Sequence, residues 1–153
     1  MPIKDTKQWF NIAVPHPTKD NQRVQLGCHL EEFLELLETV AIVNQHELLQ
    51  QLKKNLSDLS HSLKKDPESF VIILDRKEYL DAIADQIVTG TGCAHVQGMD
   101  ILGALGEVNS SNFSKFRDTD PPTPYFNEHG KISKGPNFRE PNLTKFLGTD
   151  PTA

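Results

Sequence analysis

Apolar residues recur along the chain with the three- and four-residue spacing of amphipathic helices. The clearest stretch begins at His46 and ends before Asp66-Pro67, with leucines at Leu48, Leu49, Leu52, Leu56, Leu59 and Leu63. A preceding helix is expected to begin near Gln25 or Leu26, after a polar loop, because apolar residues then recur with helical spacing up to Ala41. We predict that the two helices form an antiparallel hairpin with a break near Asn44.

Shorter apolar stretches predict the other elements. Trp9 and Phe10 fall in a short helix within residues 6–14, which two following prolines end, and we expect both rings to cap the core. Residues 76–96 and about 100–116 predict two more helices, separated by a turn. Residues 70–74 have β-strand propensity but no evident pairing partner, so we expect a buried connection or the start of a helix there.

The last quarter of the chain differs in composition from the rest. Six of the ten prolines lie beyond Phe116, and we expect residues 117–153 to form a surface tail without a core of its own. Four core helices with short links favour an all-α, four-helix-bundle-like fold in one domain over residues 1–153, with its core at about residues 6–116. Because 37% of the 153 residues are hydrophobic, the core is modest, and shared burial in an oligomer is expected.

Charge and cysteine content narrow the classes of partner and compartment. The net charge is -5 and no long basic run occurs, which argues against a nucleic-acid polymer as partner. Two cysteines, Cys28 and Cys93, are typical of a reduced cytoplasmic protein. The N-terminus carries no apolar signal segment, and no apolar run approaches the ~20 residues of a membrane span. We therefore expect a cytoplasmic protein without membrane contact.

Acidic residues gather on one face of two predicted helices. In the first, Glu31, Glu35 and Glu38 share a narrow stripe, Glu32 lies at its edge, and no Lys or Arg occurs between residues 28 and 43. An acidic face is ordinarily just solvated, and like charges one turn apart repel only weakly.

The second acidic face lies on the helix expected at residues 76–96. Glu78, Asp81 and Asp85 share it, and no Lys or Arg occurs from Glu78 to Ser114. Carboxylates at this density suit Mg²⁺ or Mn²⁺. The residue pattern by itself leaves a solvated face and a cation site as alternatives.

Several segments resemble one family, in the same order and with similar spacing. Gln25-Leu-Gly-Cys-His-Leu-Glu31-Glu32-Phe-Leu-Glu35 resembles the Glu-Glu-x-x-Glu motif of the all-α nucleotide pyrophosphohydrolases, which include MazG-like enzymes, dimeric dUTPases and phosphoribosyl-ATP pyrophosphohydrolase. Asp81-Ala-Ile-Ala-Asp85 resembles the context of their second motif, Glu-x-x-Asp. Two later segments resemble phage and bacterial MazG-like members, namely Glu107-Val-Asn-Ser-Ser-Asn112-Phe-Ser-Lys115 and Gly130-Lys-Ile-Ser-Lys134-Gly135-Pro136.

The resemblance implies a MazG-type helical bundle, at least dimeric, that cleaves nucleoside triphosphates to monophosphate and pyrophosphate with Mg²⁺ or Mn²⁺. It implies metal ligands at Glu31, Glu32, Glu35, Asp81 and Asp85. Glu32 or Glu35 would orient or deprotonate the attacking water. Asn112 and Lys115 would contact phosphate or sugar, and His29 is the best of the histidines for substrate contact. The assembly would be a homodimer or homotetramer.

The second motif departs from the family pattern. Ala82 stands where the family has a glutamate three residues before Asp85, whereas Glu78 and Asp81 form an exact Glu-x-x-Asp one turn earlier. We favour Asp81 with Asp85, because the apolar residues and the glycines Gly90 and Gly92 follow Asp85 as in the family. These glycines are expected to mark close helix contacts. The alternatives for function are phosphoribosyl-ATP hydrolysis and a noncatalytic helical adaptor with the same fold.

Overall fold

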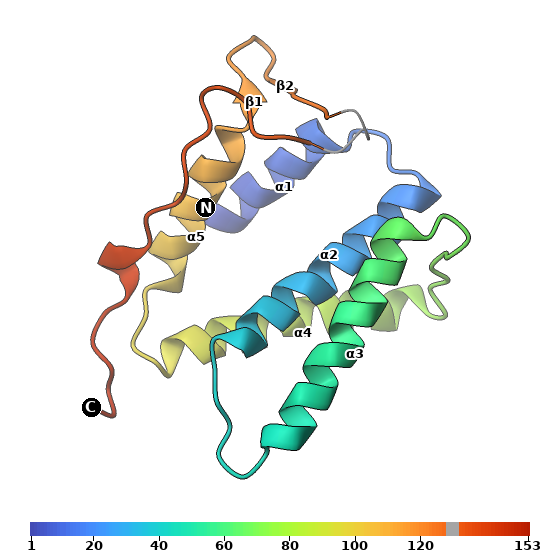
Figure 1. Cartoon of the computed structure of the whole chain (residues 1–153). Helices are drawn as coiled ribbons and strands as arrows, with labels where there is room; N and C mark the ends of the chain where they lie inside the picture. The colour runs from blue at the N-terminus through green and yellow to red at the C-terminus, as the bar shows by residue number, and fades with distance from the viewer. Residues whose placement is uncertain (128–131) are drawn as a thin grey trace. The chain divides into compact units, whose positions relative to one another are not determined.

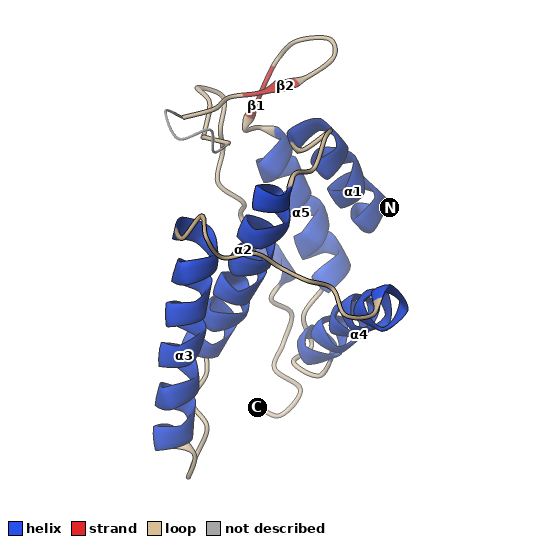
Figure 2. Cartoon of the chain, turned by 90° about the vertical axis from the view of Figure 1, so that its right-hand side faces the viewer, coloured by secondary structure: helices blue, strands red, loops and turns tan. Residues whose placement is uncertain are grey.

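The computed structural model describes residues 1–127 and 132–153, and within them the chain is mostly helical, as the sequence predicted. The α-helices there are α1 (Pro2–Ala13), α2 (Lys19–Glu38), α3 (His46–Lys65), α4 (Arg76–His95) and α5 (Ile101–Phe113). The other elements are the strands β1 (Phe116–Arg117) and β2 (Thr123–Pro124) and the 3₁₀ helix η1 (Thr144–Phe146). Figure 2 shows how little of the chain the strands occupy.

The chain divides into two compact units. One unit is His16–Ile73, which holds α2 and α3. The other combines Met1–Pro15 with Leu74–Ala153, and it holds the remaining elements.

The first unit is the predicted hairpin of α2 and α3 (Figure 1). Its break lies where the sequence placed it, because Asn44 adopts a positive φ of 63°, a conformation that asparagine tolerates better than most residues. The start of α2 was predicted too late. Thr18 caps the helix by accepting a hydrogen bond from the Asn21 backbone N–H at 3.2 Å, so α2 already begins at Lys19.

The hairpin packs closely at one glycine. A Cβ built on Gly27 would lie 2.8 Å from Lys64 Cγ and 3.1 Å from both Leu63 Cβ and the Ser60 carbonyl oxygen. The Ser60 hydroxyl donates to the Gly27 carbonyl oxygen across this contact at 2.9 Å. The two helices therefore approach closely because position 27 has no side chain.

The core of the second unit lies between α1 and α5. Trp9 stacks on the buried Phe116 with 5.5 Å between ring centroids, and its indole N–H donates to the Asn112 carbonyl oxygen at 3.0 Å. The buried Asn109 side chain joins the same two helices, since it accepts from the Thr6 hydroxyl at 2.9 Å and donates to the Pro2 carbonyl oxygen at 2.7 Å. The aromatic residues of α1 therefore serve the core, as predicted.

Helix α4 contrasts with α1 and α5, because none of its residues is buried. Its bounds agree with the prediction, but its apolar side chains remain accessible: Leu80 is 69% exposed and Ile87 is 52% exposed. Within its own unit, α4 does not make the expected close contacts at Gly90 and Gly92, since a Cβ at either would meet no described residue within 4 Å.

The tail is held by specific contacts over much of its described length. After α5 the chain forms a short antiparallel pair in which Phe116 lies opposite Pro124 and Arg117 opposite Thr123. Further on, Asp100 donates its backbone N–H to the Phe146 carbonyl oxygen at 2.9 Å, just before α5 begins. The tail thus lies against α5 at more than one place.

The connection at residues 70–74 is irregular and accessible, so the expectation of a buried segment or a helix start is wrong. Phe70 and Ile72 are 68% and 69% exposed, and Leu74 is 96% exposed. In the part of the chain that the structure describes, no helix is long and apolar enough to cross a membrane.

Candidate functional site

The acidic residues of α2 do not share one environment. Glu31 is half-buried and forms an ion pair with Lys64 of α3, whose side chain is 17% exposed. Glu32 and Glu35 are exposed on the same helix, as is His29. The absence of Lys and Arg from residues 28–43 therefore does not leave Glu31 without a basic countercharge. The lysine comes from the neighbouring helix, so the residues of α2 alone could not indicate it.

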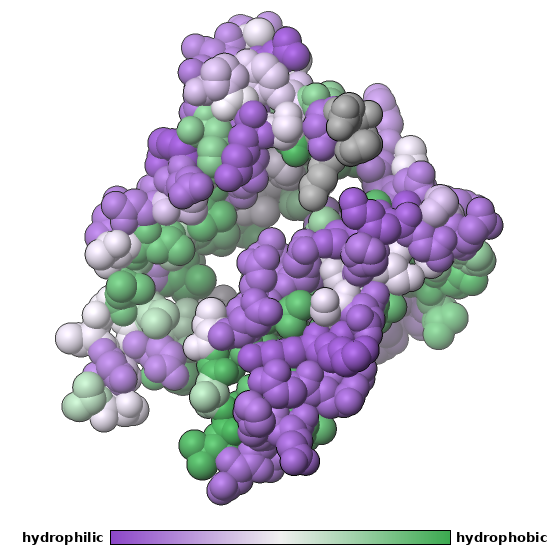
Figure 3. Space-filling view, viewed as in Figure 1, coloured by the Kyte–Doolittle hydropathy of each residue, from purple (hydrophilic) through white to green (hydrophobic). Residues whose placement is uncertain are grey.

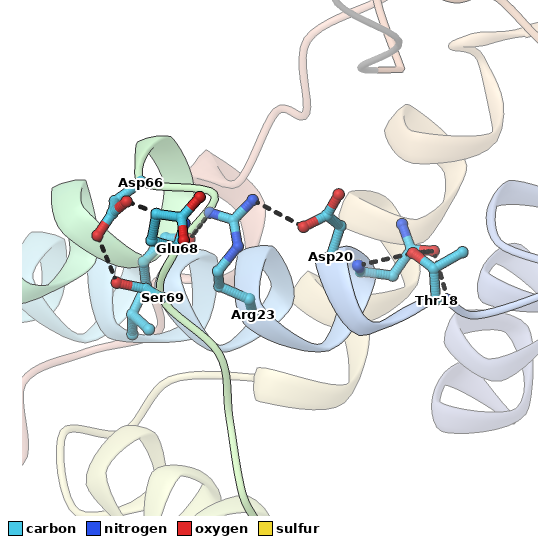
Figure 4. Close-up of polar contacts among 8 residues, drawn as sticks. Thr18, Asp20, Arg23, Asp66, Glu68 and Ser69 are labelled. Atoms are coloured by element: carbon cyan, nitrogen blue, oxygen red, sulfur yellow. Dashed lines mark hydrogen bonds and ion pairs between the residues drawn. The ribbon is translucent and has the colours of Figure 1, made fainter.

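A buried arginine fixes the same hairpin near its open end (Figure 4). Arg23 is 6% exposed and donates to the Leu63 carbonyl oxygen, one of the last carbonyls of α3, and to Asp20 at 3.1 Å. Such a contact satisfies an α3 carbonyl that has no partner within its own helix. Nearby, the Ser69 hydroxyl and the Glu68 backbone N–H bind Asp66 and hold the pKa of its carboxyl below the ordinary value. This cluster is structural.

The acidic residues of α4 are exposed on one side of that helix. Asp81 and Asp85 lie one turn apart, and among the described residues neither forms an ion pair or a side-chain hydrogen bond. Glu78 instead contacts Lys77 at 2.9 Å, close to the N-cap Asp75. Asp81 and Asp85 are therefore better suited than Glu78 to receive a cation.

The donor chemistry of these positions fits a hard divalent ion, since every predicted ligand offers carboxylate oxygens. Within neither unit do the described residues gather three His, Cys, Asp or Glu side chains into a group able to hold a metal. Glu31 would also have to exchange its lysine partner for the ion. Among the described residues, Asp81 and Asp85 have no basic partner that they would have to exchange for the ion.

The two predicted substrate residues of the resembling segment at residues 107–115 lie together at the end of α5. Lys115 donates from Nζ to Asn112 Oδ1 at 2.8 Å, and Lys115 is half-buried. A hollow of about 300 Å³ lies near the end of α5, but neither Asn112 nor Lys115 is among its lining residues. Its lining comprises Phe113, Ser114, Phe116, Arg117, Asp118, Pro122 and Asn137.

Arg139 holds the tail against α5, which the sequence analysis did not predict. The Arg139 guanidinium donates to Glu107 Oε1 at 2.7 Å and also to the Ser110 hydroxyl. The Arg139 backbone carbonyl accepts from the Ser111 hydroxyl at 2.8 Å, and its N–H donates to the Ser114 hydroxyl at 3.0 Å. Glu107, Ser110 and Ser111 of α5 and its C-cap residue Ser114 follow helical spacing, so this polar stripe was the available signal.

The docking changes the electrostatics of Glu107. Hydrogen bonds from Arg139 and from the Asn142 backbone N–H hold the pKa of the Glu107 carboxyl below its ordinary value. Its side chain is 15% exposed, so the carboxylate depends on these donors in place of most of its water. Glu107 thus acts as an anchor for the tail.

The last resembling segment, at residues 130–136, is described in part. Gly130 and Lys131 lie outside the described residues. Lys134 is exposed, with Nζ 4.4 Å from the centroid of the Phe138 ring and 3.7 Å from Glu140 Oε1. A Cβ on Gly135 would lie 2.3 Å from the Tyr125 ring, so only glycine fits the backbone approach there.

Comparison with known proteins adds no relative to this picture: no family model, no curated protein and no solved structure matches the chain.

Proposed function

We propose that the protein is a metal-dependent nucleoside triphosphate pyrophosphohydrolase, as its motifs imply. The observation that carries the proposal is the pair Asp81 and Asp85, exposed one turn apart on α4 without a basic partner among the described residues. Like charges one turn apart repel only weakly, but two neighbouring carboxylates without a basic partner leave their oxygens available to a divalent cation.

In this proposal the metal ligands are those that the resemblance implies, so Asp81 and Asp85 of α4 and Glu31, Glu32 and Glu35 of α2 would hold Mg²⁺ or Mn²⁺. The bound ion would neutralise phosphate charge and polarise the α-phosphorus. Glu32 or Glu35 accepts a proton from water as the water oxygen attacks that phosphorus. The bond from the α-phosphorus to the bridging oxygen breaks, and the products are nucleoside monophosphate and pyrophosphate.

At the far end of the substrate, Asn112 and Lys115 contact phosphate or sugar. The Lys115 ammonium balances charge as pyrophosphate leaves. Their existing hydrogen bond supports a shared role, since it holds the ammonium beside the amide before any ligand binds. His29, exposed on α2, is a further candidate for substrate contact.

We further propose a MazG-type bundle that is completed by self-association into a homodimer or homotetramer. Its support is the large exposed apolar surface of α4 and of the loop end of the hairpin. In that loop, Val40, Ile42 and Val43 are 43%, 47% and 84% exposed, and Figure 3 shows hydrophobic residues at the end of the otherwise hydrophilic hairpin surface. Burial of these side chains between copies of the chain would remove their apolar surface from water.

The test is product analysis with a panel of canonical and damaged nucleoside triphosphates. With Mg²⁺ or Mn²⁺, purified protein should release pyrophosphate and the monophosphate from at least one of them, and chelation should abolish the reaction. Orthophosphate with a diphosphate as products would refute the proposed bond cleavage. The panel also separates phosphoribosyl-ATP hydrolysis from hydrolysis of ordinary nucleotides when phosphoribosyl-ATP is included.

A noncatalytic helical adaptor is the second candidate. The Lys64 partner of Glu31 favours it, because it occupies one of the predicted metal ligands, and the open apolar faces would suit the docking of a partner. Inactivity across the whole panel, from folded protein with either metal, would support the adaptor.

A further inference from the structure

The apolar segment at residues 70–74, which follows the turn after α3, leaves its backbone unpaired. Among the described residues, none of its N–H and C=O groups takes part in a hydrogen bond. These groups bond strongly, and an extended segment that leaves them open is a template for pairing with another chain. The segment is rich in Phe, Val and Ile and contains neither Pro nor Gly, so its residues suit a strand.

Exposure alternates along the segment with the period of a β-strand. Phe70, Ile72 and Leu74 are exposed, whereas Val71 and Ile73 between them are half-buried. Because side chains of a strand alternate between two faces, three large apolar side chains share the open face. Charged side chains usually protect an open strand, but the sequence has none between residues 68 and 75.

We infer that residues 70–74 pair antiparallel with the same residues of a second copy, about a two-fold axis at Ile72. The inference rests on the proposed self-association and names a surface for it that is distinct from the α4 face. In this register Ile72 lies opposite itself, and Phe70 lies opposite Leu74 of the other copy. The exposed apolar side chains of both copies then share one face and are removed from water together.

Charges at the ends of the segment complement each other in this register. Glu68 lies opposite Arg76 of the second copy, and the two-fold symmetry forms this pair twice. Among the described residues, neither side chain has an ion-pair or hydrogen-bond partner in its own chain. Both are exposed and therefore accessible to the other copy.

Other registers lack this complementarity. A parallel pairing in register would set Glu68 beside Glu68 and Arg76 beside Arg76, and like charges directly opposite each other are destabilising. An antiparallel pairing with Val71 opposite itself would set Leu74 opposite Glu68. A slip of one residue in one copy would bring exposed residues opposite half-buried ones, because neighbouring residues point to opposite faces.

The oligomeric state of the full chain tests the surface. Ile72→Lys places two ammonium groups opposite each other in an apolar face, so the dissociation constant should rise by at least about tenfold. Leu102→Lys is the matched control, because Leu102 of α5 is 66% exposed and Ile72 is 69% exposed. It should change the constant by less than about twofold. Sedimentation velocity over a dilution series measures both, and circular dichroism checks that both variants fold.

A charge exchange tests the register. Glu68→Arg and Arg76→Glu should each weaken association, because each sets like charges opposite each other. The double variant restores opposite charges in exchanged positions and should regain most of the wild-type affinity. Additive losses in the double variant would mean that the two residues do not face each other.

Disulfide trapping tests the two-fold axis, in a chain whose own cysteines are replaced by Cys28→Ser and Cys93→Ser. Ile72→Cys should give a disulfide-linked dimer under mild oxidation, because the thiol lies opposite its own copy. Phe70→Cys should not, since the register separates the two copies of residue 70 by roughly 13 Å along the strands.

A monomeric wild-type chain at micromolar concentration would overturn the inference, as would equal effects of Ile72→Lys and Leu102→Lys or trapping of Phe70→Cys in place of Ile72→Cys. The proposed function is judged separately. Association that survives Ile72→Lys but is lost in Ile87→Lys keeps the α4 surface and removes this one. Nucleotide hydrolysis by a monomeric chain keeps the proposed activity and removes both surfaces.

Discussion

At the scale of single residues, the choice between two registers of the second acidic motif can be decided by charge removal. Asp85→Asn keeps the size of the side chain and removes its charge, so we expect activity to fall by at least about a hundredfold. Glu35→Gln should have a similar effect, because Glu35 is proposed as a metal ligand on the other acidic helix. Glu78→Gln should cost little, since Glu78 is exposed and already contacts Lys77. Initial rates of pyrophosphate release measure all three.

Folding of these variants is checked by circular dichroism and thermal melting. If Glu78→Gln is inactive while Asp85→Asn is active, the site uses Glu78 and Asp81 and lies one turn earlier. If all three variants keep full activity, carboxylates do not hold the metal and the proposed mechanism fails.

The lowered pKa of Glu107 predicts that the stability of the protein depends on pH. Arg139 and the Asn142 N–H hold its folded-state pKa below the ordinary glutamate value, with a smaller contribution from Lys145. A depressed pKa adds stability that is fully present above the unfolded-state pKa and is lost as the pH falls through the folded-state pKa. The melting temperature of Glu107→Gln should therefore lie below that of the wild type at pH 7, and the gap should narrow below about pH 4.5.

Melting curves of both proteins from pH 7 to pH 3 measure this gap. Glu140→Gln is the control, because Glu140 is 81% exposed and faces Lys134 at 3.7 Å, so its removal should change little. A gap for Glu107→Gln that stays constant with pH would mean that the carboxylate charge does not anchor the tail.

At the scale of elements, the hairpin of α2 and α3 depends on a close approach at Gly27. Gly27→Ala would place a methyl group 2.8 Å from Lys64 Cγ and 3.1 Å from the Ser60 carbonyl oxygen, so we expect a loss of about 1–3 kcal/mol. Gly106→Ala is the matched control inside α5, where a Cβ would meet no described residue within 4 Å. There the better helix propensity of alanine should add up to about 1 kcal/mol. Urea unfolding measures both, and equal effects would contradict the packing.

At the scale of the whole molecule, the exposed apolar face of α4 predicts self-association. Leu80, Ile83 and Ile87 share that face by helical spacing. Ile87→Lys should therefore shift the protein toward the monomer, because it places a charge where apolar surface would be buried. Ala82→Lys places the same charge on the same helix outside this face and should leave the assembly intact. Multi-angle light scattering at micromolar concentration measures both, and a monomeric wild type would contradict the prediction.

Hydrophobic periodicity determined much of the fold. The bounds of α4 and the hairpin break at Asn44 followed from spacing and turn chemistry, because both signals are local. Helix ends were less predictable. The polar residues after Thr18 gave no apolar pattern, yet its capping hydrogen bond starts α2 there.

The environments of the candidate site residues were decided by tertiary structure. The sequence placed Glu31, Asp81 and Asp85 on helix faces, and spacing sufficed for that. Whether each carboxylate has a partner depends on another element: Lys64 comes to Glu31 from α3, whereas Asp81 and Asp85 receive no such partner among the described residues. Periodicity describes a helix relative to its own axis, but an ion pair between helices depends on how the chain turns back on itself.

The tail shows most clearly which features the sequence determined and which features the tertiary structure decided. Its prolines correctly indicated a segment without long regular structure, because proline is incompatible with helix interiors and sheet ladders. They could not indicate that Arg139 would meet three side chains of α5 and the side chain of its C-cap residue Ser114. Those partners lie 25 to 32 residues away in sequence, and only the folded backbone brings them within hydrogen-bonding distance.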